Sequence, residues 1–498
     1  MRKKILSIVL VIVIFAFALN PIFTLPASGW GEAGSILSVG ADYSLVIKAN
    51  GNLWAWGAND YGQLGDGTTT DHISPIKIID GVKSVSAGGH NSLAIKTDGS
   101  LWSWGYNING QLGDGTTTDR HTPVRIMDNV ISASASYSHG MAIKTDGSLW
   151  AWGDNFSGQL GDGTITNRLT PVKVMNDVVS IFAGSGLSYA IKADNSLWAW
   201  GWNRDGEFGN GTTTGSYLPV KVMDNVAKIE RSGEYSGHVI KTDDSLWAWG
   251  DNCLGQFGNG TTANHFLDRK LIPVKTMDSV ATVSAGGGHC SAIKTGGSLW
   301  AWGSNNCGQL GDGTTADRLL PIKIMDNVAA VSCGGSYTLV IKTDGSLWAW
   351  GSNSSGQLGD GTTTDRLLPI KIMDGAKAPS SRNVNVIIDG SAVCFDVQPW
   401  IENGNAMVPV RAVLEEMGAA VDYDGAAMTV MAQIGGTVVV LPIGSASPTV
   451  NAIVVKIPNP IEIVSGRVVA PLRFIVEAFG GTVDWDAAEW TAVVTMAK

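Results

Sequence analysis

The stretch LWAWGSNSSGQLGDGTTTDR, residues 347–366, decides the fold because the chain repeats it. Nearly the same letters occur at residues 299–318 and 149–168. The pattern Leu-Trp-x-Trp-Gly occurs seven times, with its first tryptophan at Trp54, Trp102, Trp150, Trp198, Trp247, Trp300 and Trp348. The intervals are 48, 48, 48, 49, 53 and 48 residues. A period of this length is typical of repeat architectures, in which each unit packs on the next.

Each repeat reads as four short strands, as residues 84–131 illustrate. The four segments are SVSAGG (84–89), SLAIK (92–96), LWSWG (101–105) and PVRIMD (123–128). The second and third are separated by Asp98-Gly99, a dipeptide typical of tight hairpins because the turn requires positive φ. Four-stranded units repeated around an axis form a β-propeller. The sequence therefore predicts a mainly β fold, a seven-bladed propeller over residues 30–376.

The tryptophan pair is interpreted as part of this scaffold. Side chains alternate along a strand, so Trp102 and Trp104 share one face and Ser103 points to the other. The other six copies carry alanine at the Ser103 position. A face of large indoles opposite a face with a very small residue suits close packing between blades. We therefore expect the tryptophans to build the fold rather than to bind a ligand.

The repeated motifs also resemble those of a known family. Trp-Gly-x-Asn, Gly-Gln-Leu-Gly-Asp-Gly-Thr-Thr and Pro-(Ile/Val)-Lys-(Ile/Val) resemble the regulator of chromosome condensation repeat family in its bacterial secreted form, over residues 36–376. The resemblance implies a seven-bladed propeller that closes by joining its first and last strands into a ring. That family includes a nuclear guanine-nucleotide exchange factor and secreted inhibitors of β-lactamase. Activities do not follow from a fold, since function resides in the site.

The N-terminus and the composition indicate an exported protein. Arg2, Lys3 and Lys4 precede the apolar run 5–19, and small residues follow at 27–29, which is the order of a secretory signal peptide. We therefore expect a signal peptide at residues 1–29, secretion or association with the cell envelope, and no membrane span after cleavage. The 498 residues carry a net charge of −10 without a basic stripe, which argues against nucleic-acid binding. We expect a monomer.

Candidate binding residues are sought where the repeats differ. Each Trp-Gly is followed by a fixed Asn and, three residues later, a fixed Gly, whereas the positions between them vary. By repeat symmetry these seven loops lie on one face of the ring. Large aromatic residues stand there in units 1 to 4, and units 4 and 5 depart most from the pattern. The predicted ligand-binding residues of this face are Tyr61, Tyr106, Phe156, Trp202, Arg204, Asp205, His265 and Phe266.

Two other readings of these residues stay open. Single exposed aromatic residues are normal on protein surfaces, and apolar patches indicate an interaction site only when they are contiguous. The departures in units 4 and 5 have a second explanation as drift in a tolerant loop. An aromatic arc would suit a protein surface or a sugar ring, because both are bound by rigid amphipathic side chains.

The sequence offers no catalytic, metal or cofactor site. The seven histidines show no pair at metal-ligand spacing. The motif DGTTTD has acidic ends but lacks the glycine and the closing glutamate of a calcium loop, which favours a turn capped by its Thr and Asp side chains over a cation site. A disulfide between Cys253 and Cys307, which lie in neighbouring loops, is left open. We expect a protein without cofactor or catalytic residues.

A different repeat fills the C-terminal part after a linker at 377–384. MVPVRAVLEEMGAAVDYD at 407–424 is echoed by VAPLRFIVEAFGGTVDWD at 469–486. In each copy a proline suits the first turn of a helix and Gly418 or Gly480 ends it. Residues 385–498 resemble the N-terminal stalk domain of copper amine oxidases, which implies a small α+β accessory module. The last histidine is His289, so this module has no imidazole for copper.

The sequence predicts an exported, non-enzymatic protein whose propeller binds a protein or a polysaccharide through one loop face. The C-terminal module would attach it to a surface or act as a spacer. Two alternatives stay open. The first is an activity like that of known relatives, either inhibition of an enzyme or guanine-nucleotide exchange. The second is a purely structural role in the cell envelope.

Overall fold

The computed structural model describes residues 35–496 except 233–235, 263–268, 378–383, 394, 396–398, 403–404, 426, 458, 465–466 and 487–490. The predicted signal peptide at 1–29 lies outside the described residues. The chain divides into two compact units at residues 380 and 381, and each is described by itself. In the part that the structure describes, no helix has the length and apolar character needed to cross a bilayer.

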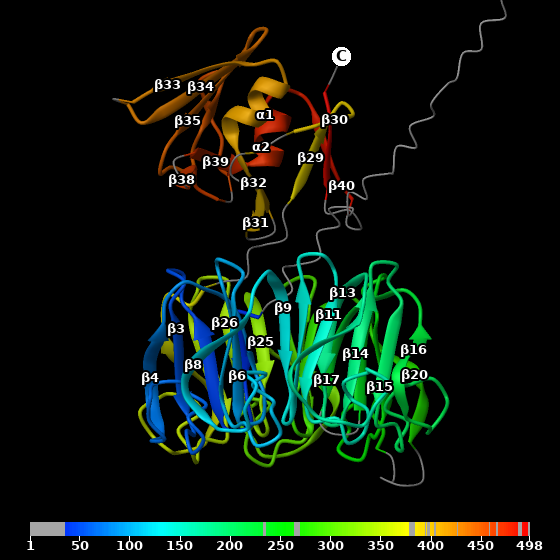
Figure 1. The fold of residues 1–498 in the computed structure, drawn as a ribbon. Helices are drawn as coiled ribbons and strands as arrows, with labels where there is room; N and C mark the ends of the chain where they lie inside the picture. Colours follow the sequence, from blue (N-terminus) through cyan, green and yellow to red (C-terminus); the bar gives the residue numbers. More distant parts are fainter. Residues whose placement is uncertain are drawn as a thin grey trace, which may run out of the picture. The chain divides into compact units, whose positions relative to one another are not determined.

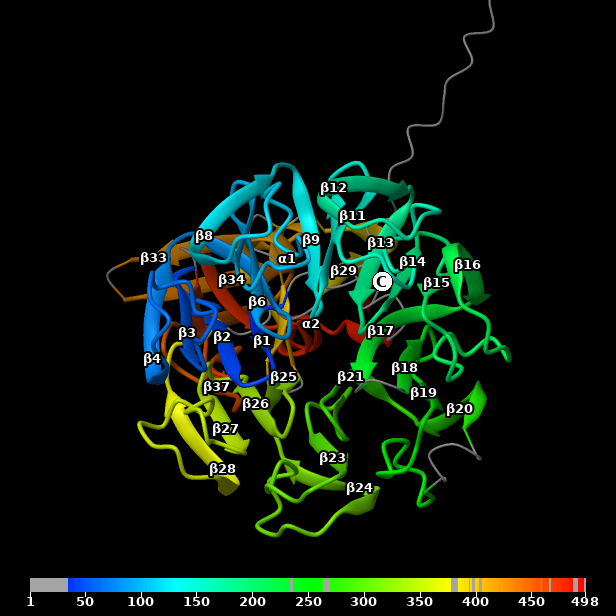
Figure 2. The same ribbon diagram turned by 60° about the horizontal axis from the view of Figure 1, so that its bottom comes forward.

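The first unit is a β-propeller. Its described residues form seven four-stranded antiparallel sheets, each made of four strands that are consecutive in the chain. Figure 1 shows the sheets from the side and Figure 2 shows them arranged around a central axis. We call the sheets blades 1 to 7 in chain order. The mainly β propeller fold predicted from the repeats is confirmed.

The strands recur at equivalent positions in every blade. Blades 1 and 2 hold β1 (Leu37–Val39), β2 (Tyr43–Ile47), β3 (Leu53–Gly57), β4 (His72–Ile79), β5 (Val82–Ala87), β6 (Asn91–Lys96), β7 (Leu101–Gly105) and β8 (Arg120–Met127). Blades 3 and 4 hold β9 (Val130–Ala135), β10 (His139–Lys144), β11 (Leu149–Gly153), β12 (Arg168–Met175), β13 (Val178–Ala183), β14 (Leu187–Lys192), β15 (Leu197–Gly201) and β16 (Ser216–Met223). Blades 5 and 6 hold β17 (Val226–Ser232), β18 (Ser236–Lys241), β19 (Leu246–Gly250), β20 (Lys270–Met277), β21 (Val280–Ala285), β22 (His289–Lys294), β23 (Leu299–Gly303) and β24 (Arg318–Met325). Blade 7 holds β25 (Val328–Cys333), β26 (Tyr337–Lys342), β27 (Leu347–Gly351) and β28 (Arg366–Met373).

The predicted hairpin between the second and third strands forms as expected. Gly99 adopts φ +79°, a value that favours glycine because it has no Cβ to clash with the backbone. Asp98 accepts hydrogen bonds from the backbone N–H of Ser100 at 2.9 Å and from its hydroxyl at 2.6 Å. The Asp-Gly dipeptide thus holds β6 and β7 in register.

The two tryptophans of each third strand have different roles. Trp104 is fully buried, and its Nε1 donates to the main-chain oxygen of Gln63 in the preceding blade at 2.8 Å. Ser92 Oγ donates to the same oxygen at 2.8 Å. A Cβ on Gly65 would lie 2.7 Å from Trp104 Nε1. The loop of one blade therefore forms the socket for the indole of the next, which is why the motifs recur together.

The first tryptophan of each pair is only half-buried. Trp102 Nε1 donates to Ser100 Oγ at 2.9 Å, and Lys96 Nζ lies 5.2 Å from the ring centroid, a cation–π contact. The same contact occurs in every blade, in the pairs Lys48–Trp54, Lys96–Trp102, Lys144–Trp150, Lys192–Trp198, Lys241–Trp247, Lys294–Trp300 and Lys342–Trp348. Both tryptophans therefore belong to the scaffold.

The ring closes differently from the expectation. We expected the first and last strands to be joined, but β1 and β28 lie in different sheets. Blade 7 instead meets blade 1 through the ordinary socket, since Trp56 Nε1 donates to the main-chain oxygen of Gln357 at 2.9 Å. The chain after β28 adds backbone hydrogen bonds, from Lys377 N to the Ile47 oxygen at 2.8 Å among others. A socket repeated in every blade needs no exchanged strand to close the ring.

The second unit is the α+β module. Its first sheet has the order β30-β29-β41-β40, with β29 parallel to β41, and its second has the order β31-β32-β39-β38. These sheets hold β29 (Asn385–Ile388), β30 (Ser391–Ala392), β31 (Trp400–Glu402), β32 (Asn405–Pro409), β38 (Glu462–Val464), β39 (Arg467–Pro471), β40 (Thr482–Asp486) and β41 (Thr491–Thr495). The third sheet holds β33 (Ala420–Asp424), β34 (Thr429–Ile434), β35 (Thr437–Pro442), β36 (Thr449–Val450) and β37 (Ile453–Val454) in that order.

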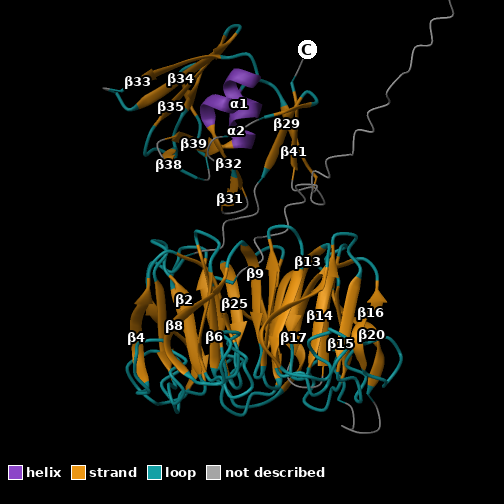
Figure 3. Cartoon of the chain, viewed as in Figure 1, coloured by secondary structure: helices purple, strands orange, loops and turns teal. Residues whose placement is uncertain are grey.

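Two short helices, α1 (Val410–Glu416) and α2 (Leu472–Ala478), carry the internal repeat (Figure 3). Gly418 and Gly480 follow them with φ +81°, which confirms the predicted helix ends. The prolines differ from the expectation, because Pro409 and Pro471 are N-cap residues rather than members of the first turn. A proline needs no N–H partner there and already has a fixed φ. Leu414, Leu472 and Val476 are among the helix residues buried in the core.

Candidate functional site

The variable loops of the propeller gather at one end of the ring. In the six blades whose turn between the first two strands is described, that turn lies beside the loop between the last two strands. Backbone hydrogen bonds of 2.9 Å join them, from Ala58 N to Asp42 O and from Tyr106 N to His90 O. We call this end the loop face. Its described segments are the turns 40–42, 88–90, 136–138, 184–186, 286–288 and 334–336 and the loops 58–62, 106–110, 154–158, 202–206, 251–255, 304–308 and 352–356.

Both chain connections of the propeller begin at the opposite end. β1 runs toward the loop-face turn 40–42, so residue 35 lies at the other end. Residues 375–377 pair with 47–49 beside the turn between β2 and β3. We call this end the hairpin face, defined by the turns 48–52, 97–100, 145–148, 193–196, 242–245, 295–298 and 343–346. The loop face therefore carries neither connection.

The fixed asparagine of each loop is structural. Asn59 is fully buried, and its Oδ1 accepts the Leu64 N–H at 3.0 Å. Its Nδ2 donates to the main-chain oxygens of Thr68 and Thr70, both at 3.1 Å. The amide thus bridges both sides of the loop, which explains why only this residue type recurs while its neighbours vary.

The DGTTTD motif is a capped turn. Asp114 accepts hydrogen bonds from Thr116 Oγ1 and Arg120 Nε, both at 2.7 Å. Burial raises the pKa of this carboxyl group, but the bonds from Thr116 and Arg120 outweigh burial and the pKa lies below its usual value. The carboxylate oxygens are used by the loop itself. In the described part of the chain, no group of three or more His, Cys, Asp or Glu residues is placed to hold a metal ion.

The structure brings together two of the predicted aromatic residues. The rings of Tyr61 and Tyr106, from blades 1 and 2, meet edge to face with their centroids 4.6 Å apart. Two further residues, which the sequence analysis missed, extend this contact. The centroid of the His90 ring lies 5.1 Å from that of Tyr61 and 6.1 Å from that of Tyr137. The turns 40–42, 88–90 and 136–138 also differ between repeats, so the variation that marks the loops marks these residues as well.

The remaining predicted residues do not continue this cluster. Phe156 is 79% exposed, and the described residues give its ring no aromatic partner. Trp202 stacks instead with Arg204 of its own loop, whose guanidinium carbon lies 4.8 Å from the ring centroid. The predicted aromatic arc is thus two separate groups and a single exposed ring. His265 and Phe266 lie outside the described residues.

Asp205 belongs to a link between blades 4 and 5. Its carboxylate forms an ion pair with Arg269, and both side chains are mostly buried, with exposures of 20% and 14%. The backbone N–H of Asp205 donates to Glu207 Oε2 at 2.9 Å. Glu207 stands where the other blades carry Gln, and burial raises its pKa. The departures of blade 4 therefore include structural replacements, not only surface residues.

Three ionisable groups, Asp42, Asp60 and His90, interact electrostatically next to Tyr61. Partial desolvation raises the pKa of Asp42, and the charge of His90 opposes this rise. Burial lowers the pKa of His90, while Asp42 and Asp60 oppose the decrease. Burial of His90 thus favours its uncharged imidazole, beside Tyr61.

Buried histidines and thiols elsewhere serve the packing. His139 lies 2.8 Å from Ser188 Oγ, and burial lowers its pKa to about 3. Cys290 Sγ lies 3.7 Å from His238 Nε2, and both side chains are fully buried, so this pair is closed to a substrate. No disulfide joins Cys253 to Cys307, and burial raises the pKa of the Cys253 thiol to about 11. A thiol with that pKa is a weak nucleophile at neutral pH.

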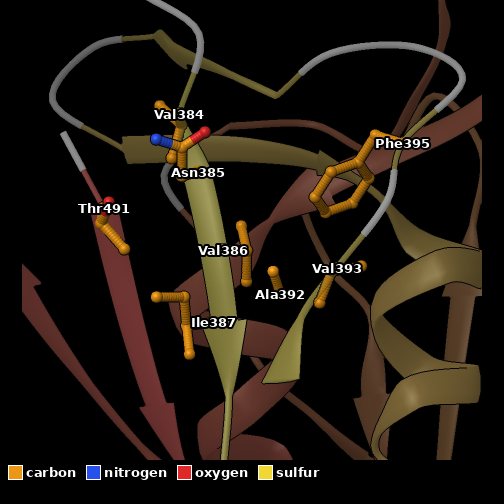
Figure 4. A pocket seen from close by; sticks show the side chains of 8 residues that line it. All are labelled: Val384, Asn385, Val386, Ile387, Ala392, Val393, Phe395 and Thr491. Carbon is orange, nitrogen blue, oxygen red and sulfur yellow. The ribbon is translucent and has the colours of Figure 1, made fainter. Parts of the chain in front are cut away.

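The second unit holds a mainly apolar cavity of about 410 Å³ along β29. Figure 4 shows Val386, Ala392 and Val393 facing it, with Phe395 at one side and Thr491 at another. Its described lining contains no ionisable side chain. It therefore offers shape and apolar contact but no group for acid–base or metal chemistry.

Three family models, which describe two families, match the chain. Models of the regulator of chromosome condensation (RCC1) repeat match six segments each, the first at 50–95, 98–143, 146–191, 243–293, 296–341 and 344–387 and the second within 36–357. The model of the copper amine oxidase N-terminal domain matches 387–494. That segment contains no histidine, so its residues do not fit a copper site. No curated protein gives a significant match.

Solved propellers resemble the first unit. Human WBSCR16 is 20% identical with a TM-score of 0.58, and the alignment covers 67% of this chain and 95% of that one. Prp20p from Saccharomyces cerevisiae, described with its binding to Gsp1p and histones, is 20% identical with a TM-score of 0.58, covering 70% and 88%. Yeast RCC1 bound to Kap60 is 21% identical with a TM-score of 0.57, covering 68% and 85%. Identities this low support the fold alone.

Proposed function

We propose a function from the premise that this chain belongs to the regulator of chromosome condensation (RCC1) repeat family. It is an exported, non-enzymatic protein that binds a protein or a glycan through its loop face. The module at 387–494, which matches the copper amine oxidase N-terminal domain, attaches it to a cell surface or acts as a spacer. The observation that carries the proposal is the contact between Tyr61 and Tyr106 across two blades on a face that carries neither chain connection.

The distribution of variation supports this proposal. The buried Asn and Gln side chains and the tryptophans are tied into the scaffold, so substitutions there disturb the ring. The residues between them are tied less and differ in every blade. Binding residues commonly lie on loops that a rigid scaffold positions. The yeast relative described with Gsp1p and histones supports a protein ligand for a propeller of this fold.

The proposal is tested by capture of ligands on the full-length protein. We compare wild type with two double variants, Tyr61→Ala/Tyr106→Ala and Tyr106→Ala/Trp202→Ala. Each protein is tested for capture of cell-surface proteins and for binding to a glycan array. The control is Ser354→Ala/Ser355→Ala, at the equivalent loop of blade 7. Ligands retained by wild type and by the control but lost by both variants support the proposal. Ligands bound equally by all four proteins contradict it.

A further inference from the structure

One part of the loop face combines tyrosine rings with negative charge. We call it the acidic–tyrosine patch, and its members are Asp42, Asp60, Tyr61, His90, Tyr106 and Tyr137. The rings are linked in series, from Tyr106 to Tyr61 at 4.6 Å, from Tyr61 to His90 at 5.1 Å and from His90 to Tyr137 at 6.1 Å. Asp42, Asp60 and Tyr137 are exposed. The patch spans blades 1 to 3.

The patch lacks a cation of its own. The turns 40–42, 88–90 and 136–138 and the loops 58–62, 106–110 and 154–158 contain no lysine or arginine. The nearest arginines in the same connections, Arg120 and Arg168, form ion pairs of 2.7 Å with Asp114 and Asp162. The charges of Asp42 and Asp60 are therefore not neutralised by a basic side chain of these segments.

A hydrogen-bond donor beneath the patch is also unmatched. In blades 2, 3, 6 and 7 the amide of the repeated glutamine donates to an acceptor on the loop face, as Gln357 does to Asp42 at 3.2 Å and Gln159 to Asp154 at 2.8 Å. In blade 1, Gln63 accepts the Tyr61 N–H at 2.9 Å. Its Nε2 is buried and has no acceptor among the described residues.

The same face shows how its aromatic rings hold a cation. In blade 4 the guanidinium of Arg204 lies 4.8 Å from the Trp202 ring centroid. Aromatic faces attract cations through their quadrupole, and nearby carboxylates strengthen the attraction. Blades 1 and 2 offer rings and carboxylates without the arginine. A basic peptide matches the rings and the carboxylates, because it carries a cation for both.

We propose that the acidic–tyrosine patch binds a lysine or arginine side chain of a protein ligand. This inference rests on the proposed function and narrows its ligand to a protein segment with exposed basic residues. A neutral glycan offers hydroxyl groups to the same rings but gains nothing from the two carboxylates. The two ligand classes therefore respond differently to removal of charge.

The test measures binding of a fluorescent peptide with four arginines to the full-length protein by anisotropy. A peptide with four serines in their place is the neutral probe. The variant Asp42→Asn/Asp60→Asn removes charge while keeping side-chain shape, and Tyr61→Ala/Tyr106→Ala removes the rings. The matched control is Asp278→Asn/Asp326→Asn, which removes the same charge from exposed aspartates that follow β20 and β24 at the hairpin-face end of the propeller, where they pair with Lys275 and Lys323.

We expect each patch variant to bind the arginine peptide about tenfold more weakly than wild type, and the hairpin-face control to stay within about twofold. Raising the salt concentration should weaken wild-type binding because exposed charges are screened. Equal losses in patch and control variants would show attraction by net charge alone and would overturn the inference. If Tyr61→Ala/Tyr106→Ala is unfolded by circular dichroism, the asparagine variant decides the question.

The inference and the proposed function fail in different ways. Suppose glycans or neutral proteins are captured by wild type and lost with the tyrosines, while Asp42→Asn/Asp60→Asn binds them normally. The loop face is then a binding face, and the inference about a basic ligand is wrong. If the arginine peptide binds wild type no better than the serine peptide, the inference is also wrong. If every ligand binds all loop-face variants equally, both are wrong.

Discussion

Trp104 Nε1 donates a hydrogen bond of 2.8 Å to the main-chain oxygen of Gln63, in the preceding blade. The same bond joins Trp56 to Gln357 across the point where the ring closes, at 2.9 Å. A single motif pair thus forms both the internal junctions and the closing one. The predictions below start from this socket.

Replacing the buried tryptophan should cost far more stability than replacing its half-buried partner. Trp104→Phe leaves the Gln63 oxygen with one donor fewer and removes buried volume, so we expect a loss of about 2–4 kcal/mol in unfolding free energy. Trp102→Phe removes a bond to Ser100 and weakens a cation–π contact, with an expected loss of about 1 kcal/mol or less. Urea unfolding followed by tryptophan fluorescence measures both. Equal losses would contradict the division of roles.

The glycine of the socket should not tolerate a side chain. In Gly65→Ala the new Cβ would lie 2.7 Å from Trp104 Nε1, at φ +84°. Gly375→Ala is the matched control, because it has a similar φ of +74° but nothing within 4 Å of the new Cβ. The control isolates the backbone cost of about 1–2 kcal/mol. We expect Gly65→Ala to lower the melting temperature clearly further than the control, and equal decreases would contradict the socket.

The propeller should lose stability in acid. Burial lowers the pKa of His139 to about 3 and the pKa values of His238 and His289 to about 4, from an ordinary value of 6.5. Below pH 6.5 the unfolded chain binds protons that the folded chain does not, so stability is complete above pH 6.5 and falls as the pH falls. The slope is at most about 1.4 kcal/mol per pH unit for each histidine.

Urea unfolding between pH 7 and pH 4 measures this slope. Replacing one buried histidine, as in His139→Gln, should reduce the slope by the share of that residue. A slope unchanged by this substitution would assign the acid sensitivity to other groups.

Glu207→Gln should stabilise the protein at neutral pH. Glu207 Oε1 is buried without a hydrogen-bond partner among the described residues, and burial raises the pKa of the carboxyl group. The stability contributed by its protonated form is complete below pH 4.5 and is lost as the pH rises through the raised pKa. Glutamine, which the other blades carry, has no charge to desolvate. We expect a gain of about 1 kcal/mol at pH 7 and none at pH 4.

The propeller should fold without the C-terminal module. Among the described residues, the closing backbone bonds extend no further than Lys377, and residues 381–498 belong to a separate compact unit with its own core. A chain ending at Ser380 should therefore keep the melting temperature of the propeller transition within about 2 °C. Calorimetry of both chains checks this. A large decrease would show that the module supports the ring.

The predictability of this protein differs between scaffold and surface. The period of the indole pairs predicted the mainly β propeller, since packing of equivalent blades requires the same large side chains at the same interval. The Asp-Gly hairpins followed from turn chemistry alone. The ring closure was predicted wrongly, because the sequence shows which motifs recur but not that Gln357 meets Trp56. The sequence predicted Pro409 and Pro471 in the first turn of their helices, whereas both are N-cap residues.

The candidate site was predicted only in part. Tyr61 and Tyr106 were found because they break the repeat at equivalent loops. His90 and Tyr137 were missed because they lie on separate turns, more than 25 residues from Tyr61, that only folding brings beside the loops. Asp205 was read as a surface residue, and only the ion pair with Arg269 across two blades shows its structural role.

By itself, the sequence determined the repeated sheet, its turns and its buried indoles, because these depend on local periodicity and on residue volume. Only the tertiary structure decided which variable residues touch one another, how the ring closes and which polar atoms lack partners. Contacts between side chains of different blades depend on how the blades are positioned around the axis, and no periodicity along one strand encodes that geometry.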